Sequence, residues 1–167
     1  MPPDSNPTIS QTRGLSFLIG RVYYNYTSLL TQRLVEYGLA EHLIPGMGPV
    51  LFALFDDDGL LMKEAAQRAG IAPSTLSGLV RRMEANGVIR RVPDSVDGRA
   101  ARLWLTPLGR SLEPACRRLA EQMETELRAG LSDGEKRELE ELLQRLLRKI
   151  QARLPGSGVE LAMEARP

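Results

Sequence analysis

The length, composition and charge of the chain exclude several classes of protein. Its 167 residues, 43% of them hydrophobic and 26% charged, suffice for one domain with a single core and exclude a chain that is disordered throughout. The formal net charge of +1 does not by itself indicate a nucleic-acid binder. No apolar run approaches the roughly 20 residues that span a bilayer, and the first ten residues lack the cationic and apolar regions of a signal peptide. The single cysteine, Cys116, cannot form an internal disulfide. We therefore expect a cytoplasmic protein without a membrane partner.

Two helices are predicted in the first third of the chain. An apolar period near 3.6 residues predicts a long amphipathic helix over about residues 12–39, interrupted at residues 44–46 (IPG). A short apolar helix is predicted over residues 49–55, and its aromatic and leucine side chains are expected to pack under the segment that follows. Residues 56–59 (DDDG) end it. Three carboxylates are compatible with a metal loop, but further ligands at a suitable spacing are missing, so a turn is favoured and no metal or cofactor is expected.

The middle of the chain has the pattern of a helix-turn-helix. The first helix ends at Gly70, a residue suited to a C-cap of positive φ, and Pro73 fits the first turn of the second helix. The buried face of the first helix is expected to carry Leu61, Ala65, Ala66 and Ala69. The buried face of the second helix is expected to carry Leu76, Leu79, Val80 and Met83. Its opposite face carries small hydrogen-bonding residues and then two cations, namely Ser74, Thr75, Ser77, Gly78, Arg81 and Arg82. Such a face suits a DNA major groove, although an ordinary solvated helix face is the plainer alternative.

A two-stranded hairpin is predicted after this helix. Residues 88–92 have the β-branched character of a strand, the polar segment 94–101 turns the chain, and residues 102–105 alternate as a return strand. Arg99 then lies near the tip of a wing, where an arginine can enter a narrow minor groove. We expect Asp97 to hold its guanidinium through a charge-assisted hydrogen bond, and Arg91 to lie near the DNA backbone.

The last third of the chain is predicted to form two long helices. Thr106 caps the first of them, which has Pro114 in its interior. Its apolar stripe comprises Leu108, Leu112, Cys116, Leu119, Met123 and Leu127. Residues 132–135 (SDGE) have the form of a capping box. The second stripe comprises Leu139, Leu142, Leu143, Leu146, Leu147, Ile150 and Leu154. The terminal helices carry more apolar surface than one module needs, which indicates a C₂ dimer; a monomeric bundle is the alternative.

These segments together resemble the signature of the MarR family of transcription regulators. The resemblance is carried by residues 75–84 (TLSGLVRRME), 87–91 (GVIRR), 97–99 (DGR) and 105–109 (LTPLG), in the same order and spacing. A helix-turn-helix alone occurs in many folds, whereas its combination with an Asp-x-Arg wing and a Leu-Thr-x-x-Gly helix entry is specific. The resemblance covers roughly residues 10–153. It implies a triangular homodimer that binds double-stranded DNA.

The charge distribution agrees with this placement. Residues 60–106 hold 8 basic and 4 acidic side chains, whereas residues 1–59 hold 3 and 6, and residues 107–167 hold 11 of each. The positive excess therefore falls on the expected DNA-reading module, as contact with phosphates would require.

The expected fold is mainly α, with a small wing of two or three β-strands, in a single domain. Residues 10–44 form an N-terminal dimerisation helix, residues 47–106 the winged helix-turn-helix and residues 107–154 the C-terminal dimerisation helices. Residues 1–9 and 155–167 are expected to be flexible tails.

The expected function is that of a homodimeric repressor, released from a pseudo-palindromic site by a small molecule. The resemblance implies phenolic or other amphipathic effectors that bind between the dimer helices and the winged module. Five residues are candidates for lining this pocket: Tyr23, Tyr24, Tyr26, Phe52 and Cys116. Core packing is the plainer explanation of these aromatic residues. Alternatives for the whole chain are a winged helix that contacts proteins and an architectural DNA-binding protein without an effector.

Enzyme chemistry is not expected, because no catalytic or metal-binding constellation can be assembled around the single histidine, His42. His42 is interpreted as a polar residue at the end of a helix, with a pH-sensitive or ligand-contacting role as the alternative. A redox role for Cys116 is not favoured, since it lies on an apolar stripe rather than in the first helix, where the resemblance places peroxide-sensing cysteines.

Overall fold

The computed structural model describes residues 14–154, in which the chain forms six helices and three strands. In chain order these elements are α1 (Leu15–Glu36), α2 (Gly48–Asp56), β1 (Leu60–Leu61), α3 (Met62–Ala69), α4 (Pro73–Ala85), β2 (Ile89–Pro93), β3 (Ala101–Leu105), α5 (Pro107–Arg128) and α6 (Asp133–Gln151). The predicted helix start at residue 12 and the tails at residues 1–9 and 155–167 lie outside the described residues.

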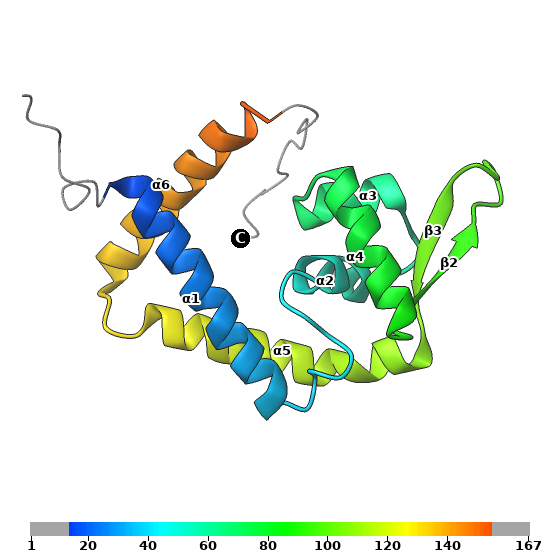
Figure 1. Ribbon diagram of the computed structural model, residues 1–167, viewed down its shortest axis with the longest axis horizontal. Helices are drawn as coiled ribbons and strands as arrows, with labels where there is room; N and C mark the ends of the chain where they lie inside the picture. Colours follow the sequence, from blue (N-terminus) through cyan, green and yellow to red (C-terminus); the bar gives the residue numbers. More distant parts are fainter. Residues whose placement is uncertain (1–13, 155–167) are drawn as a thin grey trace, which may run out of the picture.

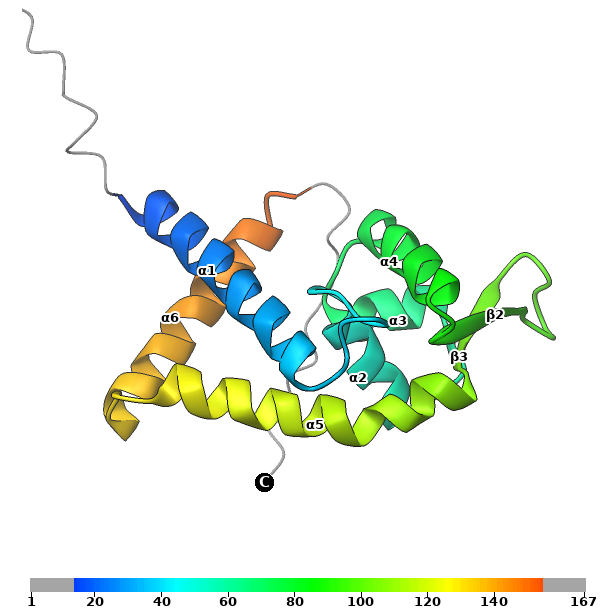
Figure 2. The same ribbon diagram turned by 60° about the horizontal axis from the view of Figure 1, so that its bottom comes forward.

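The elements form two groups joined by α5. In Figure 1, α1 and α6 lie on one side, α2, α3, α4 and the three strands lie on the other, and α5 runs beneath both groups. The turned view in Figure 2 shows α5 continuing from the end of β3 toward α6. The observed fold is therefore the mainly helical winged helix-turn-helix, flanked by long helices, that the sequence predicts.

Local sequence signals explain the helix-turn-helix. Gly70 adopts a φ of 65° at the end of α3, and Pro73 occupies the first turn of α4, as predicted. Leu76, Val80 and Met83 bury the inner face of α4.

The small sheet contains one strand more than the predicted hairpin. The strand order is β1-β3-β2, and Leu103 of β3 pairs with Leu60 on one side and Arg91 on the other. The prediction that Leu61 belongs to the first helix of the helix-turn-helix, α3, was wrong. Leu61 is extended, with φ −61° and ψ 150°, because it pairs with Arg102 and precedes the first turn of α3. A run of two residues is too short to show a strand period.

Asp58 closes the end of the sheet rather than forming part of a metal loop. Its carboxylate Oδ1 accepts hydrogen bonds from the backbone N–H groups of Gly59 at 3.0 Å and Leu105 at 2.9 Å. Its other oxygen pairs with Arg110 of α5. The carboxylate thereby joins the end of α2 to the sheet and to the long helix.

The core continues from the winged module into α5. Met47, Leu51, Leu54 and Leu103 are almost fully buried within the module. Four members of the predicted α5 stripe, namely Leu112, Cys116, Leu119 and Met123, are also buried.

The two long helices begin at the predicted caps. Thr106 Oγ1 accepts a hydrogen bond from the Gly109 N–H at 3.0 Å, and the backbone N–H of Glu135 donates to Ser132 Oγ at 3.3 Å. Helix α5 continues through Pro114, which removes one hydrogen bond to the preceding turn. Helix α6 contributes no buried residue within the described chain. None of the helices in residues 14–154 combines the length and apolar composition that crossing a membrane requires.

The joint between β2 and α5 requires glycine at position 109. An added Cβ there would lie 2.1 Å from the backbone oxygen of Val88 and 3.2 Å from Leu105 Cδ2. Val88 cannot move away freely, because its carbonyl accepts a hydrogen bond from the Thr106 N–H at 3.0 Å. Close approach of backbone to backbone therefore fixes this residue type.

We expect Gly109→Ala to lower the free energy of unfolding by about 2 kcal/mol, the usual cost of overpacking a tight contact. Urea denaturation measures the change. Gly134→Ala is the matched control, because position 134 also lies in the first turn of a helix but its Cβ would meet only Ser132 Oγ at 4.0 Å. Equal free energies of unfolding for the two variants would show that the backbone around Val88 accommodates the added methyl group without loss of stability.

Candidate nucleic-acid interface and ligand pocket

The outward face of α4 carries the residues that the sequence assigns to the major groove. Ser74, Thr75 and Ser77 are exposed in the first turns, and Arg81 and Arg82 are exposed further along. Gly78 is half-buried, yet a Cβ at this position would meet nothing within 4 Å. The structure therefore gathers all six predicted residues of α4 away from the core.

Two internal hydrogen bonds order part of this face. Ser77 Oγ donates to the Pro73 carbonyl oxygen at 2.9 Å, and Arg81 Nε donates to the Ser77 carbonyl oxygen at 3.4 Å. The second bond is long, so the guanidinium of Arg81 is held only weakly to its own helix.

The wing projects beside α4, and Arg99 is exposed in the loop between β2 and β3 (Figure 1). Asp97 does not hold the guanidinium of Arg99, contrary to the sequence-based expectation. Its Oδ1 accepts the backbone N–H of Arg99 at 3.0 Å. An aspartate side chain is short and reaches a backbone N–H two residues onward more readily than the end of a long side chain. Asp97 thus shapes the loop and leaves the guanidinium exposed.

The principal support of the wing is Asp94, which the sequence analysis missed. It is 7% exposed and the only buried charged residue in the described chain. Its carboxylate accepts the N–H groups of Val96 at 3.2 Å and Asp97 at 3.0 Å, and the guanidinium of Arg102 at 2.5 Å. The available signal was an aspartate directly after a strand, followed by a cation in the return strand.

These bonds change the acidity of Asp94. The backbone N–H of Asp97 and the guanidinium of Arg102 both favour the carboxylate and lower its pKa from the usual value. Because the folded-state pKa lies below that of the unfolded chain, the stabilisation is present at neutral pH and is lost only as the pH falls through the lowered pKa.

Arg91 is exposed on β2 and pairs with Glu84 of α4. Its Nε lies 2.8 Å from Glu84 Oε2, and its backbone N–H donates to Glu84 Oε1 at 3.2 Å. The pair connects α4 to strand β2 of the wing.

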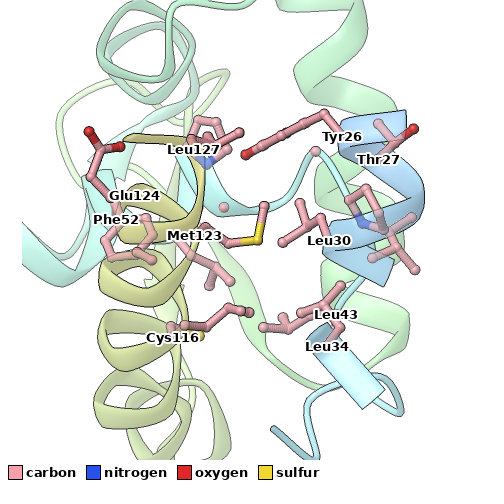
Figure 3. A pocket seen from close by; sticks show the side chains of 18 of the residues that line it. Tyr26, Thr27, Leu30, Leu34, Leu43, Phe52, Cys116, Met123, Glu124 and Leu127 are labelled. Atoms are coloured by element: carbon pink, nitrogen blue, oxygen red, sulfur yellow. The ribbon is translucent and has the colours of Figure 1, made fainter. Parts of the chain in front are cut away.

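A pocket of about 480 Å³ lies between α1, α5 and the segment that leads into α2. Figure 3 shows Tyr26, Leu30 and Leu34 of α1 facing Met123 and Leu127 of α5 across this space. The volume is in the range typical of small-molecule sites.

The pocket collects four of the five predicted lining residues, namely Tyr23, Tyr26, Phe52 and Cys116. Tyr24 does not line it. A helix turns by about 100° per residue, so Tyr24 projects from another face of α1, where its side chain is 71% exposed. The segment 43–46 also lines the pocket and was missed, because a sequence pattern does not show where a connection folds.

The Cys116 thiol has an apolar environment. Burial raises its pKa, and the negative charge of Glu113 adds to this effect. A thiol with a raised pKa is a poor nucleophile, consistent with the sequence-based view that a redox role is not favoured.

A polar cluster fastens α1 to α5 beside the pocket. Arg33 donates two hydrogen bonds to the carboxylate of Glu126, both at 3.1 Å, and Tyr37 donates to Gln122 Oε1 at 2.5 Å. Hydrogen bonds from Gln122 and Arg33 lower the pKa of Glu126. The cluster sets the distance between the two helices that form the pocket.

His42 lies in the connection after α1, near the C-terminal end of α4. Its backbone carbonyl accepts a hydrogen bond from Asn86 Nδ2 at 2.8 Å. The contact joins the α1–α2 connection to the C-terminus of α4.

Comparisons with known proteins agree with this architecture. The MarR family model matches residues 48–100. The transcriptional regulator HosA of Escherichia coli is 30% identical over 101 residues, which cover 60% of this chain and 72% of HosA. The HTH-type transcriptional regulator TtmR of Methylorubrum extorquens is 39% identical over 64 residues, which cover 38% of this chain and only 33% of TtmR. The S. aureus MepR–DNA complex has a TM-score of 0.71 and 25% identity, covering 81% of this chain and 98% of MepR.

The transcriptional regulators that the chain resembles share this winged helix-turn-helix carried on long helices. The chain belongs to the MarR family, which confirms the resemblance seen in the sequence. It is a transcriptional regulator and not an enzyme, as its relatives show.

We expect Asp94→Ala to loosen the wing, because the substitution removes three hydrogen bonds at a buried carboxylate. The backbone amides of Val96 and Asp97 should exchange hydrogen about tenfold faster or more, the effect of losing one charge-assisted bond. Exchange measured by NMR at neutral pH tests this. Asp97→Ala is the control and should affect mainly the amide of Arg99; unchanged exchange in the Asp94 variant would contradict the assigned support.

Proposed function

We propose that the protein is a homodimeric repressor that binds a pseudo-palindromic DNA site and is released by a small molecule. The observation that carries the proposal is the exposed face of α4, where small hydrogen-bonding side chains precede two arginines, beside a wing with an exposed Arg99.

Each exposed residue receives a role from its position. Ser74, Thr75, Ser77, Gly78 and Arg81 would face base edges in the major groove, where the first turns of a recognition helix lie. The open space around Gly78 allows the helix to approach the bases closely.

The remaining cations would contact the DNA backbone and the minor groove. Arg82 lies in the last turn of α4, and Arg91 is fixed between α4 and the wing by Glu84, so both would lie near phosphates. Arg99 would enter the minor groove from the wing.

Unpartnered apolar side chains support the homodimer. On α1, Leu15, Leu18 and Val22 are 63%, 54% and 68% exposed, and on α6, Leu143 is 54% exposed. Isolated helices gain most of their stability from packing an apolar face. A second copy of the chain would cover these faces and place two recognition helices for half-sites about one helical turn apart.

The position of the pocket supports release by a ligand. Its walls come from α1 and α5, which reach the proposed dimer side, and from Leu51 and Phe52 of α2, which packs against α3 of the helix-turn-helix. A ligand that favours one separation of these walls would change the distance between the two recognition helices and thereby the affinity for DNA.

Selection of fragmented genomic DNA by the purified chain at near-physiological salt tests the function. We expect a short inverted repeat with half-sites about 10 bp apart. On that site, Arg99→Ala should weaken binding about tenfold and reduce the slope of log affinity against log salt by about one unit. Arg118→Ala is the control, since Arg118 is exposed on α5, outside the expected DNA-reading module of residues 47–106. Recovery of only unspecific fragments, or equal affinity of the two variants, would contradict the proposed reading of DNA.

The dimer is tested by Leu146→Glu, which places a charge in the apolar stripe of α6. We expect the variant to be monomeric in sedimentation equilibrium and to lose at least about tenfold in DNA affinity, because an unpaired charge at an interface is strongly unfavourable. Arg145→Glu lies next to it but off the stripe and should remain dimeric. A dimeric Leu146→Glu variant would place the interface elsewhere.

A further inference from the structure

The pocket between α1 and α5 has few polar side chains in its lining. Most of its lining is aliphatic or aromatic, and the 19 residues that line it within the described range 14–154 include no lysine, arginine or histidine. The side chains with oxygen atoms are those of Tyr23, Tyr26, Thr27 and Glu124. Hydrogen-bonding groups are therefore present, but a positive charge is not.

The hydroxyl groups lie on the α1 side. Thr27 Oγ1 lies 2.9 Å from the carbonyl oxygens of both Tyr23 and Tyr24, so its proton is engaged by the helix and only its lone pairs remain for a ligand. The hydroxyl of Tyr26 points across the space toward Leu127 in Figure 3. Tyr26 can both donate and accept, so the α1 wall offers one donor and several acceptors.

The cation beside the Phe52 ring is already paired outside the pocket. Arg117 lies 5.9 Å from the centre of the Phe52 ring and binds Glu113 at 2.7 Å and Asp56 at 3.4 Å. Since Phe52 lines the pocket and Arg117 does not, the aromatic ring separates this guanidinium from a ligand.

The carboxylate of Glu124 belongs to the rim. It pairs with Arg128, which also binds Glu140 of α6 at 2.6 Å. Figure 3 shows the Glu124 carboxylate directed away from the Tyr26 and Leu30 side of the pocket. Among the described residues, the only charged group of the lining is thus a carboxylate, and Arg128 already pairs with it.

An anionic ligand would lose its hydration in this pocket without gaining a cationic partner. Transfer of an unpaired carboxylate into apolar surroundings is strongly unfavourable, whereas an amide or hydroxyl group of the same size costs far less and can use Tyr26 and Thr27.

We propose that the pocket binds an uncharged, largely apolar ring compound with one hydrogen-bonding group and rejects carboxylates of the same shape. This specificity rests on the proposed function, in which the pocket is the effector site. Tyr26 and Thr27 supply the polar contacts, and the absence of a cation from the lining provides the discrimination.

Three naphthalene probes, of which the amide and the carboxylate are isosteric, test the specificity by isothermal titration calorimetry at about pH 7.5, where the acid is ionised and the others are neutral. They are 2-naphthol, 2-naphthamide and 2-naphthoate. We expect the first two to bind and the naphthoate to bind at least about tenfold more weakly than the amide. Binding of the naphthoate within threefold of the amide would overturn the proposal, and so would the failure of all three probes to bind.

A variant with a cation in the pocket provides the converse test. Thr27→Lys should strengthen naphthoate binding at least about tenfold relative to the unmodified chain, because the ammonium group then pairs with the carboxylate. Ser28→Lys is the matched control, since Ser28 is the next residue on α1, is exposed and does not line the pocket. Equal naphthoate affinity in the two variants would overturn the assigned site.

DNA binding measured on the same samples separates this inference from the proposed function. If the chain binds its inverted repeat but shows no preference for neutral probes, the ligand specificity fails and the DNA-binding function stands. If neutral probes bind in the expected order while specific DNA binding is absent, the specificity stands and the proposed function fails.

Discussion

The contact between the Val88 carbonyl and the start of α5 is the constraint on which the rest of the structure depends. This oxygen accepts the backbone N–H of Thr106 at 3.0 Å, the Thr106 hydroxyl donates to the adjacent Gly87 carbonyl at 2.6 Å, and Gly109 packs directly against the Val88 oxygen. The recognition module and the long helix therefore share one rigid joint. The ion pair between Asp58 and Arg110 adds a second contact between the module and α5 next to this joint.

Sequence periodicity and capping residues predicted most of the fold, because these signals are local. Gly70, Pro73, Thr106 and Ser132 each mark a helix end through their own backbone preference or side chain. Strand β1 was missed since its two residues become a strand only by pairing with β3. Pairing partners distant in the chain leave no period in so short a segment.

The sequence predicted the parts of the candidate sites that lie on single helix faces, but not the parts formed by residues distant in the chain. The exposed face of α4 follows from helical spacing alone, and the α1 and α5 walls of the pocket follow from two apolar stripes. Asp94 was missed because its importance depends on Arg102 and on two loop amides that meet only after the wing has folded. Tyr24 was misplaced because clustering in the sequence was taken for clustering in space, and adjacent helical residues diverge.

Pro114 creates a point in α5 at which the helix can bend more easily than elsewhere. The helix is missing one backbone bond between the joint at Gly109 and the pocket residue Cys116. The rise of 1.5 Å per residue places Arg128 about 21 Å beyond this point. A bend of about 5° at Pro114 would thus move the far end of α5 by about 2 Å. The long helix then acts as a lever with its pivot next to the pocket, converting a small change in side-chain packing into a larger displacement at the distant helices.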